Sequence, residues 1–163
     1  MGKSPIFWYG GKYYQAKDII ELFPPHITYV EVFGGAAHVL FKKPPSPVEV
    51  YNDINGDIVN FFRVLRTPQK AEQLMMLLQL TPYSREECLT CRSTLHDASV
   101  DDVERARRWF VSLTQSFGGT FTGWSYSKKD SNGGMSAAVY KWLGRIHRDL
   151  PAAVERLRTV QIE

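Results

Sequence analysis

The sequence is poor in the features that mark secreted and membrane-spanning proteins. Its 163 residues include only two cysteines, too few for the disulfide framework of a small secreted domain. No apolar run approaches the roughly 20 residues that cross a bilayer. The N-terminal MGKSPIFWYGGK also lacks the apolar stretch of a secretory signal. These absences predict a cytoplasmic protein with no membrane partner.

The chain carries little net charge, but the charge is unevenly distributed. The formal net charge is +3, whereas residues 105–149 contain eight Lys or Arg and only two Asp. Four acidic residues lie just before that window, at positions 97, 101, 102 and 104, and reduce the contrast. A local basic surface is still expected, and phosphate is the natural partner of such a surface.

The first third of the sequence alternates between strand and helix patterns. Helices are predicted at 12–22, 36–43 and 54–66, and strands at 28–33 and 47–53. The Pro-Pro pairs that follow the first two helices end them, because proline cannot continue a helix. Strands that alternate with helices form parallel sheets, so the predicted fold class is α/β.

The rest of the chain is mainly helical in pattern. Apolar residues recur at helical spacing through most of 68–157, and residues 158–163 return to strand-like alternation. The glycine- and serine-rich segment 116–134 predicts a long loop, which in a compact domain is usually functional or disordered. We therefore expect an α/β part over residues 1–67, a helical insertion over 68–157 and a third strand at 158–163.

A glycine pair lies between the first predicted strand and the next helix. Gly34 and Gly35 would let the backbone approach a ligand closely at a helix N-terminus. Asp53 ends the second strand, where nucleotide-binding folds hold a ribose hydroxyl pair, and Glu31 ends the first. A plain strand-to-helix turn with a helix-capping Asp53 would explain the same residues without any ligand.

Three segments together resemble one enzyme family. Trp8-Tyr9-Gly10-Gly11-Lys12, Phe33-Gly34-Gly35-Ala36-Ala37 and Asn52-Asp53-Ile54-Asn55 match, in order and spacing, the motifs of the Dam-type (D12 class) N6-adenine DNA methyltransferases. The resemblance implies a partial Rossmann-like S-adenosylmethionine-dependent methyltransferase sheet with a mostly helical DNA-recognition insertion. It also implies site-specific methyl transfer to adenine in double-stranded DNA, in a restriction-modification context.

The same resemblance implies a cofactor site. Asp53 would accept hydrogen bonds from the ribose hydroxyls, Lys12 would meet the cofactor carboxylate, and Trp8 or Phe33 would pack on its apolar or cationic parts. The residues expected to bind S-adenosylmethionine are Trp8, Gly11, Lys12, Glu31, Phe33, Gly34, Gly35 and Asp53.

The sequence departs from the family pattern in two places. Ala37 stands where the family commonly has the last glycine of its turn, and the catalytic Asp-Pro-Pro-Tyr segment is absent. We therefore expect no catalytic residue in this chain. The chain would be the N-terminal part of such an enzyme, or one half of a split enzyme, with the missing C-terminal half as a partner.

The loop at 116–134 and its basic neighbours are the candidate DNA surface. Lysines and arginines there would contact phosphates, and aromatic side chains among the glycines would stack or wedge. A solvated basic face, with aromatic residues that pin the loop to the helices, is the alternative. The candidate DNA-binding residues are Arg105, Arg108, Phe121, Trp124, Tyr126, Lys128, Lys129, Lys141 and Arg145.

Other functions fit the sequence less well. A non-catalytic DNA-binding module derived from the same fold is the main alternative. A nicotinamide-dependent oxidoreductase is disfavoured because the turn lacks the Gly-x-Gly-x-x-Gly pattern. Cys88 and Cys91 form a single C-x-x-C pair without clustered histidines, so no metal site is predicted.

Overall fold

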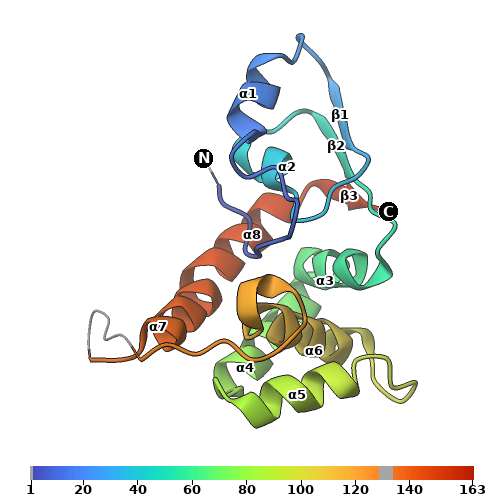
Figure 1. The fold of residues 1–163 in the computed structure, drawn as a ribbon. Coiled ribbons are helices and arrows are strands. Elements are labelled where there is room, and N and C mark those ends of the chain that lie inside the picture. The colour runs from blue at the N-terminus through green and yellow to red at the C-terminus, as the bar shows by residue number, and fades with distance from the viewer. Residues whose placement is uncertain (1, 129–133) are drawn as a thin grey trace.

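The computed structural model describes residues 2–128 and 134–163 and places a small sheet at one end of a helical body (Figure 1). The sheet has three parallel strands in the order β1 (Thr28–Glu31), β2 (Val48–Tyr51) and β3 (Val160–Ile162). Val30 of β1 lies opposite Val50 of β2, which in turn lies opposite Gln161 of β3. The predicted parallel sheet and its returning third strand are therefore confirmed.

Three helices alternate with the first two strands along the chain. They are α1 (Ala16–Glu21), α2 (His38–Lys42) and α3 (Gly56–Arg66). The first helix begins at Ala16 rather than at the predicted residue 12, since the preceding residues form turns. Helix α3 begins where the Asn55 side chain accepts hydrogen bonds from the amides of Asp57 and Ile58, as an N-cap residue does.

The segment after residue 67 is mainly helical, as the periodicity predicted. It contains α4 (Pro68–Leu80), α5 (Arg85–Ser93) and α6 (Asp102–Thr114), then the short 3-10 turn η1 (Phe117–Gly119). Ser84 and Asp101 cap α5 and α6 through their side-chain oxygens. No helix in the described part of the chain is long and apolar enough to cross a membrane.

One continuous helical run returns the chain to the sheet. It consists of α7 (Ala137–Gly144), the π-helical segment η2 (Arg145–Asp149) and α8 (Leu150–Leu157), coloured orange to red in Figure 1. The periodicity predicted a helix here but not the π turn, which has no simple sequence signal. Near the end of α8, Arg156 forms an ion pair with the buried Glu49 of β2, which ties the returning helix to the sheet.

The core is aromatic and joins the sheet to helices α3 and α6. Phe61 of α3 stacks on Phe110 of α6, with 5.4 Å between ring centroids, and Phe62 packs on Tyr51 of β2 at 4.9 Å. All four side chains are fully buried. This packing fixes the end of β2 against α3, and the candidate site lies where that strand ends.

Candidate functional site

The glycine turn after β1 is held by the residue that ends β2. The amide of Gly35 donates a hydrogen bond of 2.7 Å to Asp53 Oδ2, and the amide of Asn55 donates to Asp53 Oδ1 at 2.9 Å. Gly34 donates to the carbonyl of Asn52 at 2.9 Å. The Asp53 carboxylate therefore clamps two strand ends together. Each of its oxygens can accept a further hydrogen bond, since a carboxylate has about four acceptor sites.

The turn requires glycine for two different reasons. A Cβ on Gly34 would lie 2.1 Å from Cε2 of Tyr51, so the Tyr51 ring occupies the space that a side chain would need. Gly35 has a φ of +47°, in the left-handed region that glycine adopts without strain. Ala37 also has a positive φ, of +54°. Ala37, which stands where the family commonly has a glycine, thus still adopts a left-handed backbone conformation.

Glu31 lies inside the protein at the end of β1. Its side chain is 5% exposed, and Oε2 accepts a hydrogen bond of 2.9 Å from the amide of Leu40 in α2. The other oxygen, Oε1, is buried without a hydrogen-bond partner among the described residues. Burial raises the pKa of Glu31, although the Leu40 amide and the charge of Lys12 act in the opposite direction.

The N-terminal segment packs against the same turn. Lys12 Nζ donates a hydrogen bond of 2.9 Å to the carbonyl of Phe33. The indole of Trp8 lies beside Gly35, where a Cβ would be 2.9 Å from Trp8 Cδ1. The amide of Gly11 donates to the carbonyl of Trp8, and a Cβ on Gly11 would lie 2.9 Å from that carbonyl oxygen. The structure therefore brings together the predicted cofactor residues at the carboxyl ends of β1 and β2.

Two exposed apolar side chains border this assembly. Phe33, which the sequence predicted, is 77% exposed, and Ile54, which it did not, is 98% exposed. Ile54 follows Asp53 directly, inside the Asn-Asp-Ile-Asn motif that the family resemblance rests on. Its position between an acidic residue and the N-cap Asn55 is the signal that could have identified it.

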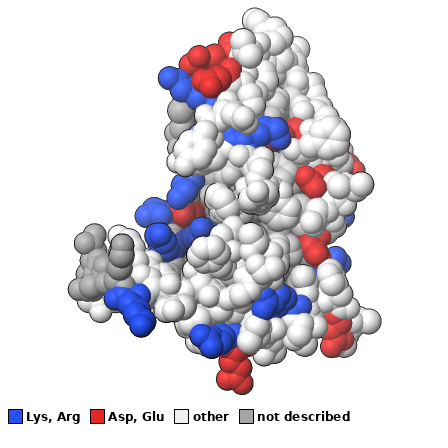
Figure 2. All heavy atoms as spheres, viewed as in Figure 1, with Lys and Arg blue, Asp and Glu red and all other residues white. Residues whose placement is uncertain are grey.

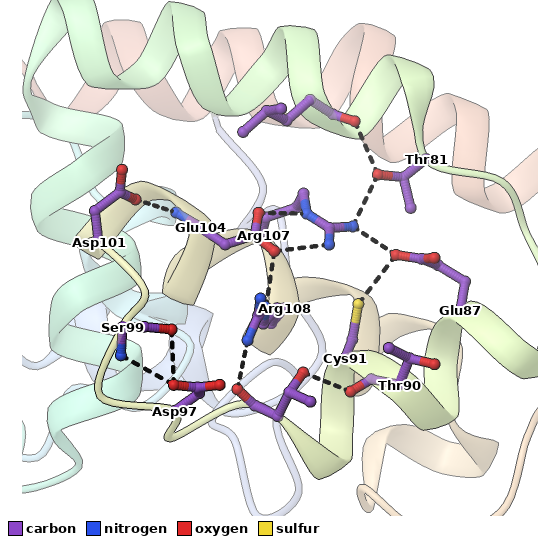
Figure 3. Close-up of polar contacts among 12 residues, drawn as sticks. Thr81, Glu87, Thr90, Cys91, Asp97, Ser99, Asp101, Glu104, Arg107 and Arg108 are labelled. Atoms are coloured by element: carbon purple, nitrogen blue, oxygen red, sulfur yellow. Dashed lines mark hydrogen bonds and ion pairs between the residues drawn. The ribbon is translucent and has the colours of Figure 1, made fainter.

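Some of the candidate DNA-binding cations are engaged within the protein. Arg105 donates two hydrogen bonds to Asp57, at 2.6 and 2.9 Å. Arg108 donates to Glu104 and to the carbonyl of Thr94, both at 2.7 Å. Figure 3 shows Arg107 and Arg108 sharing Glu104. Arginines fixed in this way hold α6 against its neighbours and present less free charge to a phosphate.

Other candidates lie around a cavity of about 420 Å³ that residues of the loop help to line. Tyr126, Lys141 and Arg145 line it together with Phe7 and Trp142. Tyr126 is 61% exposed and stacks on Trp124, with 5.7 Å between centroids.

Two loop aromatics instead hold the loop on the helices. Trp124 packs against Tyr83 at 5.9 Å, and Phe121 packs against Trp109 at 6.1 Å. Lys128 is exposed, whereas Lys129 lies outside the described residues.

Comparisons with known proteins identify the family. A family model described as D12 class N6 adenine-specific DNA methyltransferase matches residues 8–133, which is most of the chain. The chain belongs to this family.

Three relatives carry names of the same kind. Over 120 residues the chain is 32% identical to type II methyltransferase M1.LlaDCHI of Lactococcus lactis subsp. cremoris, covering 70% of this chain and 41% of the relative. It is 38% identical over 66 residues to modification methylase StsI of Streptococcus sanguinis, covering 40% of this chain and 10% of the relative. It is 27% identical over 120 residues to the DNA N-6-adenine-methyltransferase of Escherichia phage P1, covering 72% of this chain and 16% of the relative. The chain thus spans less than half the length of each of these relatives.

Proposed function

We propose that this chain supplies the S-adenosylmethionine site and a DNA-contacting surface of an N6-adenine DNA methyltransferase with a Rossmann-like sheet. The observation that carries the proposal is the Asp53 clamp, with its partly exposed carboxylate between the glycine turn and Ile54. Residues 1–67 would bind the cofactor, residues 68–157 would recognise the target, and residues 158–163 would return the chain to the sheet. Such an enzyme would work on DNA in the cytoplasm, and the relatives named as modification enzymes support a restriction-modification setting.

The residues around the clamp fit the cofactor. The Asp53 oxygens match the two ribose hydroxyls, and exposed Phe33 and Ile54 would cover the flat aromatic faces of the cofactor's adenine ring. Lys12 donates one hydrogen bond to Phe33, and its ammonium retains donors for the cofactor carboxylate. Trp8 and the glycine turn would form one wall of the site, with the Trp8 ring beside Gly35 and the Tyr51 ring beside Gly34.

The division of chemical work follows from the residues present. The bound cofactor supplies an electrophilic methyl group, and this chain's residues hold and orient it. By family resemblance, the groups that hold the target adenine belong to an Asp-Pro-Pro-Tyr segment, which this sequence lacks. The complete reaction would therefore need that segment from elsewhere.

Substitution of an exposed residue tests the cofactor site without disturbing the fold. Ile54→Ala should weaken S-adenosylmethionine binding about fivefold, because partial burial of this side chain against a ligand is worth roughly 1 kcal/mol. Ile27→Ala is the matched control, since Ile27 is 70% exposed and precedes β1 at the opposite end of the strands. Isothermal titration calorimetry with S-adenosylmethionine and S-adenosylhomocysteine measures the cofactor affinity of both variants and of the unaltered chain. Equal affinities would remove Ile54 from the site.

Asp53→Ala probes the clamp itself. The loss of a charge-assisted hydrogen bond to the ligand costs roughly 1.5–3 kcal/mol, which weakens binding at least about tenfold. The variant also leaves the Gly35 amide without its acceptor, so its unfolding in urea is measured alongside. Unchanged cofactor affinity in a folded variant would contradict the proposal for Asp53.

A further inference from the structure

Two neighbouring cavities meet beside η2. The first is the cavity of about 420 Å³ that contains Tyr126 and Lys141. The second, of about 470 Å³, is lined by the N-terminal segment and by Lys3 and Asp149. Phe7 and Arg145 line both cavities, so these two side chains stand between them. Figure 2 shows Lys and Arg side chains gathered where this face of the molecule is hollowed.

The hollow carries more positive than negative charge. Lys3 and Arg148 are 63% and 69% exposed, and they share the 7%-exposed carboxylate of Asp149, at 3.8 and 2.8 Å. Arg145 is held close to the N-terminal segment by a 3.1 Å hydrogen bond to the carbonyl of Pro5. Arg145 lines the same cavity as Asp149, and exposed Lys141 lines the neighbouring cavity, whereas Asp149 is the only acidic residue among the described residues that line either cavity. Arg107, in contrast, is shared between the two carboxylates Glu104 and Glu87.

The π turn and the exposed aromatic residues are a second, independent observation. Arg145 and Asp149 are the first and last residues of η2, and both line the cavity formed with the N-terminal segment. Single π turns inside α-helices occur frequently at functional sites. Phe7 and Tyr9, which are 50% and 81% exposed, line the cavity formed with the N-terminal segment, and Tyr126, which is 61% exposed, lines the other cavity together with Phe7. Cations interleaved with exposed aromatic rings are typical of nucleic-acid surfaces.

We propose that Lys3 and Arg148 contact phosphates of duplex DNA, which lies along the hollow between the N-terminal segment and the α7–η2 helix. This inference rests on the proposed function and adds the N-terminal segment and η2 to the DNA-contacting surface. Asp149 acts as a positioning residue that holds the two cations side by side. The sequence pattern had assigned the DNA surface to the loop and its neighbours, and neither Lys3 nor Arg148 was among those candidates.

The salt dependence of duplex binding tests these contacts. In the Lys3→Ala/Arg148→Ala variant, the slope of log affinity against log salt should flatten by about two units, because each phosphate contact contributes about 0.9. Affinity at 0.1 M salt should fall roughly 10- to 100-fold and equally for unrelated duplex sequences. Fluorescence anisotropy with labelled duplexes at several salt concentrations gives both quantities.

Two variants control for charge and for folding. Lys17→Ala/Arg158→Ala removes the same charge from exposed residues that pair locally with Glu21 and Glu155, and it should leave the slope unchanged. Lys3→Arg/Arg148→Lys keeps both positive charges beside Asp149 and should retain the original slope. If this conservative variant shows the same flattening of the slope as the double alanine variant, the effect is structural and the assignment is overturned.

The remaining outcomes separate this inference from the proposed function. If the unaltered chain binds duplex DNA and the double alanine variant has the same slope, the phosphate contacts are wrong while the proposed function stands. If the double alanine variant loses affinity for only one duplex sequence, the two residues read bases and not phosphates, which would likewise overturn the assignment. If the unaltered chain does not bind duplex DNA at all, the proposed DNA surface fails and this inference fails with it.

Discussion

Replacement of Gly34 by alanine is the sharpest structural test of the turn between β1 and α2. The new Cβ would lie 2.1, 2.6 and 2.8 Å from three ring carbons of Tyr51. That ring cannot move aside easily, because it is fully buried and packs on Phe62 with 4.9 Å between centroids. Its hydroxyl also donates a 2.8 Å hydrogen bond to the carbonyl of Gly35. The clash therefore acts on the turn and on the core together.

The expected destabilisation follows from these contacts. Overpacking a well-packed core costs typically about 1–3 kcal/mol, and loss of the Tyr51–Gly35 hydrogen bond adds about 0.5–1.5 kcal/mol. A total of roughly 3 kcal/mol corresponds to a fall in melting temperature of about 6–12 °C for a chain of this size. Cofactor affinity should fall as well, because the Gly35 amide that Asp53 holds would be displaced.

Gly56→Ala is the matched control, with the opposite expected sign. Gly56 is the first residue of α3, and a Cβ added there would meet no atom within 4 Å. Alanine at this position should stabilise the protein by about 0.4–1 kcal/mol, because it restricts the unfolded chain. Urea unfolding followed by tryptophan fluorescence gives both free energies. Equal stabilities of the two variants would refute the packing argument for Gly34.

The sequence predicted the sheet well because its signals are local. β-branched and aromatic runs that end in Gly34-Gly35 and at Asp53 mark both first strands, and the structure places those strands within two residues of the predicted bounds. The third strand followed from a short alternating run after a long helical block, and it pairs with β2 as expected. The clustering of Lys12, Phe33 and Asp53 was inferred from family motifs that the chain retains.

Contacts between distant residues could not be predicted in this way. Asp57 lies 48 positions before Arg105, and no local pattern indicates that it engages this arginine. The sequence therefore treated Arg105 as free charge. It likewise missed Arg148, which lies in the π-helical segment η2 and pairs with Asp149 at 2.8 Å. Ile54 was overlooked because an isoleucine beside a helix start is normally expected to pack inward, whereas here it is 98% exposed.

His38 makes stability depend on pH, since burial, together with the charges of Lys42, Lys12 and Lys3, lowers its pKa to about 4. The unfolded chain binds the proton first, so the stabilisation is complete above pH 6.5 and about 3 kcal/mol is lost as the pH falls toward 4. Urea unfolding at several pH values should show this slope, and His38→Gln should flatten it. Glu49→Gln should cost about 3 kcal/mol by the same measurement, because Lys43 and Arg156 lose their buried counter-charge. Finally, the chain alone should not methylate DNA. Methyl transfer requires the adenine amino group to be held in attack geometry, and such positioning supplies several kcal/mol of the barrier. The Asp-Pro-Pro-Tyr segment that holds the base in the family is absent from this sequence. Incubation with labelled S-adenosylmethionine and mixed-sequence duplex, with and without a fragment that carries such a segment, measures this directly. Methyl incorporation by the chain alone, above a no-protein control, would show that other residues in it hold the adenine.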